Sequence, residues 1–137
     1  MASKVYLSHV VEHLHDVVGA MAEVSRICRH GARVIVETPH FSSVNSYIDP
    51  THCQHLSWFT FDLLAGRRFS DHSQVPFELR IVERKLLFHG NFPTDLIGKV
   101  LARISMYSYE LRCAWMFPAS NIYCEFEVIK DGHRGSE

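Results

Sequence analysis

Histidine is concentrated in the first part of this 137-residue chain, where seven of its ten histidines fall within the first 55 residues. They are His9, His13, His15, His30, His40, His52 and His55. An unperturbed imidazole titrates near neutral pH, so histidine serves both as a general acid or base and as a metal ligand. The chemistry of the chain is therefore expected in this region.

The first group that could do chemistry is the run His9-x-x-Glu12-His13. On a regular helix this spacing would put His9 and His13 on one face, as a pair of metal ligands needs. Zincin-type runs place the glutamate directly after the first histidine, whereas this run lies at the end of a predicted strand. Three roles stay open here: a general base or substrate-orienting pair, a structural start to the following helix, and metal binding.

The second group is the segment 49–55, which holds a carboxylate, a hydroxyl, a thiol and two imidazoles. It reads Asp49, Pro50, Thr51, His52, Cys53, Gln54 and His55. A zinc site could use His52 and His55 with Asp49 or Cys53, but structural zinc sites take two separated ligand pairs and no second pair is visible. The other interpretations are an Asp-Pro turn held by local hydrogen bonds and a loop that reaches over a pocket and binds substrate.

Two strands and a helix are expected to position both groups. Residues 4–7 are short, apolar and rich in strand formers. Asp16 is the predicted cap of a helix with apolar residues at three- and four-residue spacing, which should end at the segment 29–31 with its basic side chains and glycine. Residues 33–38, with a Val-Ile-Val centre, favour a buried strand. Strand, helix and strand make one βαβ unit with parallel strands, so the polar segments that follow the two strands should meet at one rim of the sheet.

The rest of the chain continues the α/β pattern. The predicted elements are a short helix over 61–65 that Thr60 caps and Gly66 ends, a strand over 77–88, a helix within 91–116, a strand over 122–129 and a frayed tail over 131–137. The helix within 91–116 is predicted from apolar residues at helical spacing, namely Leu96, Val100, Leu101, Ile104 and Tyr107. We therefore expect one α/β domain spanning residues 1–130.

Composition narrows the function classes. The chain is 47% hydrophobic and 21% charged, which suits a globular domain, and its net charge of −1 with no basic run gives no support for binding to nucleic acid or to a membrane surface. The four cysteines stand at irregular spacing with no Cys-x-x-Cys pair, so we expect reduced thiols and a cytoplasmic protein. A small-molecule partner is the expectation that remains.

Two stretches of the sequence resemble a known family. The first stretch is Tyr6-Leu7-Ser8-His9-Val10-Val11-Glu12-His13-Leu14, and the second, after the predicted helix, is Gly31-Ala32-Arg33-Val34-Ile35-Val36-Glu37-Thr38-Pro39-His40. Together with the helix between them, they are similar to the fourth strand, next helix and fifth strand of class I S-adenosylmethionine-dependent methyltransferases of the type 11 group. The resemblance implies a partial Rossmann-like methyltransferase sheet, mostly parallel with an antiparallel last strand and helices on its faces. It also implies methyl transfer from S-adenosylmethionine to a small polar acceptor.

The resemblance also implies roles for particular residues. By position in the family pattern, Ser8 and His9 would border the methyl donor. The acceptor would be oriented or deprotonated by Glu12, His13, His52 or His55. Acceptor binding would involve His40, Asp49 and Thr51. None of these residues is assigned as a metal ligand.

The family's cofactor loop has no counterpart in this sequence. The glycines form no Gly-x-Gly pattern, so the chain looks like the carboxyl-terminal half of a methyltransferase, and S-adenosylmethionine is not expected to bind tightly to it alone. The first strand would then be a sheet edge, and three possibilities stay open: another chain supplies the first half, two copies dock edge to edge, or the sequence is a truncated gene product that does not do the reaction alone. Two other functions stay open: a non-catalytic partner-binding subunit or pseudoenzyme, and a metal-binding module built on the histidine cluster.

Overall fold

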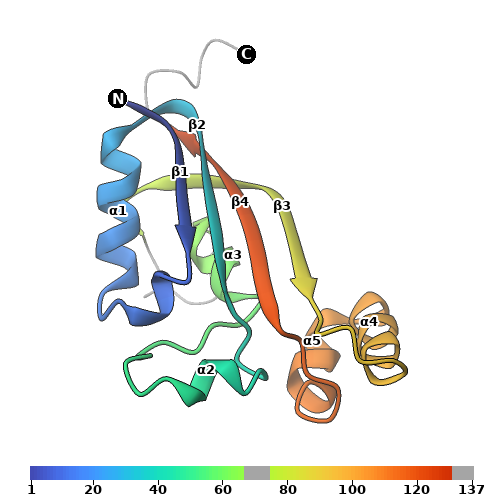
Figure 1. The fold of residues 1–137 in the computed structure, drawn as a ribbon. Helices are drawn as coiled ribbons and strands as arrows, with labels where there is room; N and C mark the ends of the chain where they lie inside the picture. The colour runs from blue at the N-terminus through green and yellow to red at the C-terminus, as the bar shows by residue number, and fades with distance from the viewer. Residues whose placement is uncertain (67–74, 131–137) are drawn as a thin grey trace.

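The computed structural model of the chain describes residues 1–66 and 75–130, so the frayed tail predicted over 131–137 lies outside the described residues. The strands are β1 (Ala2–Ser8), β2 (Cys28–Pro39), β3 (Glu78–Leu87) and β4 (Asn121–Ile129). The helices are η1 (Val11–His13), α1 (Val17–Ile27), α2 (Asn45–Ile48), α3 (Thr60–Leu64), α4 (Thr94–Ile104), α5 (Met106–Ser108) and η2 (Tyr109–Cys113). Figure 1 shows the strands side by side, with α2, α4 and α5 beyond one end of the sheet.

The four strands form one mixed sheet in the order β1-β2-β4-β3. β1 and β2 are parallel, and β4 runs antiparallel to both of its neighbours, β2 and β3. Hence β1, β2 and β3 share one direction and only the last strand is reversed, which confirms the predicted α/β fold with an antiparallel last strand. Because β4 inserts between β2 and β3, two of the three strand pairings are antiparallel, so the pairings are not mostly parallel as the sequence suggested.

The hydrophobic core lies against one face of the sheet. Every second residue of β4 is fully buried, namely Ile122, Cys124, Phe126 and Val128. Met21 of α1 and Phe61 of α3 belong to the same apolar cluster, so both helices cover this face. Burial also raises the pKa of the Cys124 thiol to about 12, which keeps it uncharged at neutral pH. All four cysteines are free thiols, as predicted.

The first βαβ unit forms as predicted, with one shift at the end of its helix. The Asp16 side chain accepts a hydrogen bond from the Gly19 backbone N–H at 2.8 Å and caps α1. The helix ends at Ile27 rather than at 29–31, because Cys28 already pairs with Ala2 across the parallel β1 and β2. Gly31 has a φ of 79° inside the strand segment instead of at a helix cap.

The later helices differ more from the sequence expectation. Thr60 begins α3 rather than capping it, and its hydroxyl oxygen accepts from the Ser57 backbone N–H at 3.1 Å. The single helix expected within 91–116 is broken at Ser105, which caps α5 through a bond from the Ser108 N–H, and residues 109–113 wind as a π-helix. Most of the apolar stripe of this region faces solvent: Leu96, Val100, Ile104 and Tyr107 are exposed, and Leu101 is half-buried.

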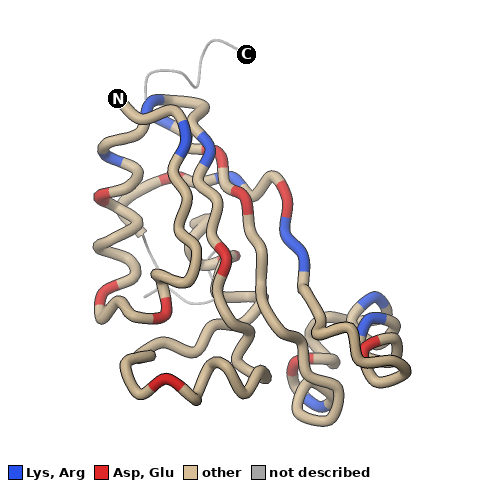
Figure 2. The backbone as a smooth tube through the Cα atoms, viewed as in Figure 1, with Lys and Arg blue, Asp and Glu red and all other residues tan. Residues whose placement is uncertain are grey.

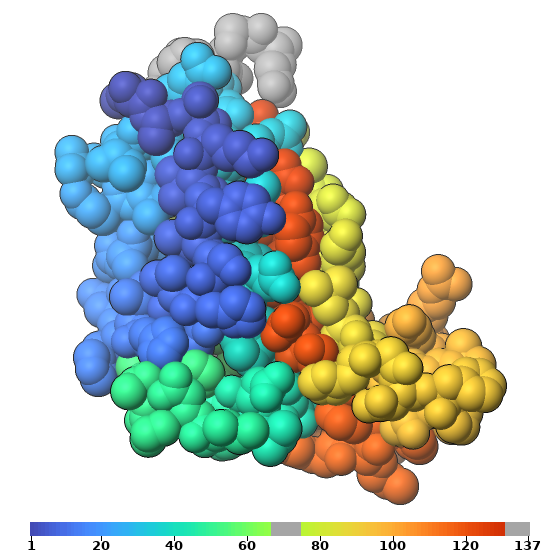
Figure 3. Space-filling view, in the orientation of Figure 1, coloured from blue at the N-terminus to red at the C-terminus, as the bar shows by residue number. Residues whose placement is uncertain are grey.

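Among the described residues, β1 forms one edge of the sheet, and its Tyr6 side chain is 58% exposed. Figure 3 shows β1, in dark blue, at the surface of the molecule. Charges of both signs are spread over the strands and helices (Figure 2), in keeping with the small net charge. None of the helices among residues 1–66 and 75–130 has the length and apolar character needed to cross a membrane.

Candidate functional site

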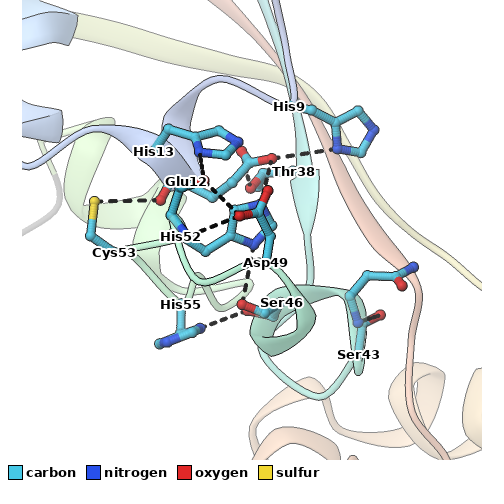
Figure 4. A network of polar contacts seen from close by, with 12 residues as sticks. His9, Glu12, His13, Thr38, Ser43, Ser46, Asp49, His52, Cys53 and His55 are labelled. Carbon is cyan, nitrogen blue, oxygen red and sulfur yellow. Dashed lines mark hydrogen bonds and ion pairs between the residues drawn. The ribbon is translucent and has the colours of Figure 1, made fainter.

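The polar segments after β1 and β2 meet at one end of the sheet, as the parallel pairing requires. η1 follows β1, and the loop that contains residues 49–55 folds back onto it. The backbone N–H groups of Cys53 and Gln54 both donate to the Glu12 carbonyl oxygen, at 2.8 and 3.1 Å. The two groups identified in the sequence therefore form one cluster (Figure 4).

Glu12 lies at the centre of this cluster and is 2% exposed. Its Oε2 accepts a hydrogen bond of 3.0 Å from the hydroxyl of Thr38, which comes from β2. Its Oε1 is buried and has no hydrogen-bond partner among the described residues. His9 Nδ1 lies 3.5 Å from this oxygen and His52 Nε2 lies 3.9 Å from it. A buried carboxylate with one unpartnered oxygen is costly unless something binds to that oxygen.

His52 faces Glu12 across the cluster. Its Nδ1 lies 3.2 Å from the Ser46 carbonyl oxygen, which can only accept, so the Nδ1 carries the proton of this bond. Its Nε2 lies 3.7 Å from Asp49 Oδ2 as well as near Glu12. The second ring nitrogen of His52 is thus directed at two carboxylates.

His13, Thr51 and Asp49 form a hydrogen-bonded chain at the rim. Thr51 donates its hydroxyl to Asp49 Oδ1 at 2.6 Å and its backbone N–H to the same oxygen at 2.8 Å. These bonds, the hydroxyl bond first, hold the pKa of Asp49 below its ordinary value. The Thr51 oxygen is also 3.0 Å from His13 Nδ1, and the His13 ring meets the His52 ring edge-on at 4.6 Å between centroids.

The remaining predicted site residues lie around or away from this cluster. Ser8 and His9 are exposed at the end of β1, and His9 has a φ of 54°, a left-handed conformation that is uncommon outside glycine. His55 lies to one side, where its Nδ1 is 2.7 Å from the Ser46 hydroxyl and its ring stacks on Tyr47 at 4.1 Å.

His40 is not brought to the cluster. It is completely buried, with Nδ1 2.6 Å from Ser42 Oγ and Nε2 2.6 Å from Glu110 Oε2. Glu110 Oε2 also accepts from the Trp58 backbone N–H at 3.0 Å. A methyl acceptor could reach the His40 ring only if this packing opened. The buried position of His40 therefore does not support its predicted role in acceptor binding.

Sequence reasoning missed two residues that shape these sites. Thr38 was placed only as part of a strand, although its hydroxyl is the hydrogen-bond donor to Glu12. Glu110 sits in the π-helical turn and is 70 positions from its partner His40, so no local spacing signals the contact. For Thr38, the signal was its position at the carboxyl end of a strand parallel to the one before Glu12.

Comparisons with known proteins identify the fold. No model of a known protein family matches this sequence, and no curated protein sequence matches it. Among solved structures, the crystal structure of a SAM-dependent methyltransferase from Archaeoglobus fulgidus is similar, with a TM-score of 0.50 and 18% identity. The match covers 91% of this chain and 58% of that one, so the chain spans a little over half the length of this structural neighbour. At this identity the likeness shows a shared α/β fold.

Proposed function

We propose that this chain is part of an S-adenosylmethionine-dependent methyltransferase and that it carries the side of the site where the methyl acceptor binds. The observation that supports the proposal most is the position of the Glu12, His13 and His52 cluster beyond the carboxyl ends of two parallel strands. Ligands of open α/β sheets bind at this edge. The structural likeness to a SAM-dependent methyltransferase points to the same class, and membership of the type 11 group is part of the proposal.

In this proposal each group of residues has its own task. S-adenosylmethionine supplies the methyl group when bound, and Ser8 and His9, exposed at the end of β1, would lie beside it. Glu12 and His52 would orient a small polar acceptor or take its proton, since both present an acceptor atom to the cluster. Asp49 and Thr51 at the rim would hold the acceptor's polar groups. Positioning supplies most of the rate in such in-line transfers, and a base is needed only for a hydroxyl acceptor.

Nuclear magnetic resonance of the ¹⁵N-labelled chain, titrated with S-adenosylhomocysteine, tests this proposal. Calorimetry should show no tight binding, because the glycine-rich loop of the family has no counterpart among these residues. At millimolar ligand, however, we expect shifts confined to the amides of Ser8, His9 and the start of η1. A His9→Ala variant should reduce them, while His89→Ala, which removes an exposed histidine in the segment after β3, should leave them unchanged. If the amides of Ser8, His9 and η1 do not shift at millimolar S-adenosylhomocysteine, or if the shifts are confined to α4 and β3, the proposal is contradicted.

A second candidate function is a non-catalytic subunit that binds a partner through β1. The observation in its favour is that β1 is an edge strand with the Tyr6 side chain exposed. The free backbone groups of an edge strand are a template for adding another strand.

Light scattering at increasing protein concentration tests this second candidate. If β1 pairs with a second copy, the chain will dimerise, and Tyr6→Lys will return it to a monomer because a charged side chain on an edge opposes pairing. Val82→Lys, at an exposed position of β3, is the matched control. A wild-type monomer at high concentration, or a dimer that Tyr6→Lys does not affect, argues against self-association through β1.

A further inference from the structure

We propose that Glu12, His13 and His52 form a binding site for a divalent first-row transition metal ion such as Zn²⁺. Each of these residues offers one ligand atom, and the three atoms lie within 4.8 Å of one another. The proposal goes beyond methyl transfer and does not rest on it, because it follows from the hydrogen bonding of these three side chains. With the ion bound, Glu12 and His52 would be its ligands and would not also take a proton from an acceptor.

The hydrogen bonds leave lone pairs, rather than protons, facing the centre of the cluster. His52 donates its Nδ1 proton to the Ser46 carbonyl oxygen, so its Nε2 presents a lone pair toward Glu12. The Thr51 hydroxyl gives its proton to Asp49, so the Thr51 oxygen accepts from His13 Nδ1 and the lone pair of His13 is on Nε2. Glu12 Oε1, which is buried and has no hydrogen-bond partner within residues 1–66 and 75–130, completes the set.

Three acceptors that face one another repel unless a cation lies between them. Zn²⁺ binds imidazole nitrogen and carboxylate oxygen at about 2.0–2.2 Å, so ligand atoms of a tetrahedral site lie about 3.3–3.6 Å apart. The Glu12 Oε1 to His52 Nε2 distance is 3.9 Å, and all three ligand atoms lie within 4.8 Å of one another. An inward movement of about 1 Å, in which the exposed His13 side chain can take the largest part, would close the site. Two imidazoles with one carboxylate leave a fourth position open, as catalytic zinc sites do.

The outer contacts of the three side chains are those that metal ligands usually have. Histidine ligands donate their second ring N–H to a carbonyl, carboxylate or other acceptor, which fixes the ring and its tautomer. His52 has the Ser46 carbonyl and His13 has Thr51, itself held by Asp49. Glu12 is fixed through its other oxygen by Thr38. His9, with Nδ1 3.5 Å from Glu12 Oε1, lies where a fourth ligand could approach.

The competing explanation is that a second proton on His52, rather than a metal ion, supplies the positive charge between these side chains. A doubly protonated His52 would pair with Glu12 and Asp49 through Nε2 and would leave no room for an ion. The two explanations differ in whether the chelator-treated protein takes up metal, so binding of the metal itself decides between them.

Calorimetric titration of the chelator-stripped chain with Zn²⁺ is the test. We expect the chain to bind one equivalent of Zn²⁺ tightly and to melt at a higher temperature when Zn²⁺ is bound. His13→Ala and Glu12→Gln should weaken Zn²⁺ binding about 100-fold or more, which is more than the loss of a group that only hydrogen-bonds to a ligand would cause. His13 is exposed, so His13→Ala tests the site even if Glu12→Gln fails to fold. The control is His15→Ala, which removes an exposed histidine two residues away.

The same experiment can overturn the proposal. No uptake at about 1 mM Zn²⁺ would leave the proton as the cation in the cluster. Zn²⁺ binding that survives His13→Ala but is lost in Cys53→Ser would belong to the exposed thiol of Cys53 rather than to this site. Equal affinity in the wild type, His13→Ala and a folded Glu12→Gln would also refute it.

Discussion

The pairing of His40 with Glu110 and the pairing of His52 with Glu12 both lie beyond the ends of the strands, and they differ in how closely the histidine and the carboxylate meet. His40 is fully buried, and both of its nitrogens have partners at 2.6 Å, one of them Glu110. His52 instead faces Glu12 Oε1 at 3.9 Å, too far for a direct hydrogen bond. Each carboxylate has one buried oxygen, Glu110 Oε1 and Glu12 Oε1, that finds no hydrogen-bond partner among the described residues. Only Glu12 Oε1, however, has two imidazoles beside it, because His9 Nδ1 also lies 3.5 Å away. A short buried hydrogen bond fixes a fold, whereas imidazoles held apart around an open buried oxygen mark a candidate site for a ligand. We therefore assign a structural role to the first pairing and a functional role to the second.

The largest expected effect is from breaking the His40 and Glu110 pairing. Glu110→Ala removes the acceptor of both His40 Nε2 and the Trp58 N–H, so we expect the free energy of unfolding to fall by about 3–5 kcal/mol. Urea denaturation followed by circular dichroism measures the change. Glu23→Ala, which removes an exposed carboxylate that pairs with Arg26, should leave the denaturation midpoint nearly unchanged. Similar midpoints for the two variants would mean that this buried pairing does not hold the fold.

A smaller effect is expected where the functional cluster is anchored to the sheet. Thr38→Val keeps the shape of the side chain but leaves Glu12 Oε2 without its donor, so we expect a loss of about 1–3 kcal/mol in the free energy of unfolding. Thr38→Ser retains the hydroxyl and is the matched control for the missing hydrogen bond. If Thr38→Val is as stable as Thr38→Ser, the Glu12 carboxylate is not fixed in the way that the metal proposal needs.

Local signals in the sequence predicted the first half of the fold well. The capping position of Asp16 and the Val-Ile-Val strand fixed the βαβ unit, and its parallel strands correctly brought the segments after Leu7 and Pro39 together. The parallel strands did not predict that residues 49–55 close onto Glu12, because this contact is made by the Cys53 and Gln54 backbone N–H groups. The tautomer of His52 could not be predicted because it depends on the loop fold that brings the Ser46 carbonyl to Nδ1. The orientation of the Glu12 carboxylate depends on Thr38, which is 26 positions away.

The second half shows the limit of periodicity. The spacing of Leu96, Val100 and Ile104 correctly indicates a helical stripe, but the stripe faces solvent rather than the core. A period shows which residues share a face and not what covers that face. The break at Ser105 and the π-helical turn that carries Glu110 depend on tertiary contacts, such as the bond from the Tyr109 hydroxyl to the Phe117 carbonyl.

Removing an imidazole from the functional cluster should affect stability little. His13 is exposed, so His13→Ala in metal-free buffer should change the free energy of unfolding by no more than about 0.5 kcal/mol. Urea denaturation beside Glu110→Ala compares the buried His40 and Glu110 pairing with the cluster around Glu12. A loss as large as that of Glu110→Ala would show that His13 supports the fold, and the contrast between the structural pairing and the functional cluster would fail.

The smallest effect concerns the direction of one proton at the rim. The Thr51 hydroxyl lowers the pKa of Asp49 most, so Thr51→Val should raise that pKa toward its ordinary value, while Thr51→Ser should not. The pKa of Asp49 is lower in the folded chain than in the unfolded chain, so ionised Asp49 stabilises the fold. This stabilisation is fully present at a pH above the pKa of the unfolded chain, and it is lost as the pH falls through the pKa of the folded chain. The Thr51→Val variant makes this stabilisation smaller. Carboxyl ¹³C shifts titrated from pH 2 to 6 measure the change. An unchanged Asp49 pKa in Thr51→Val would mean that the Thr51 proton points to His13 instead. His13 Nδ1 would then hold the lone pair, and the ligand atom assigned to His13 in the metal site would be wrong.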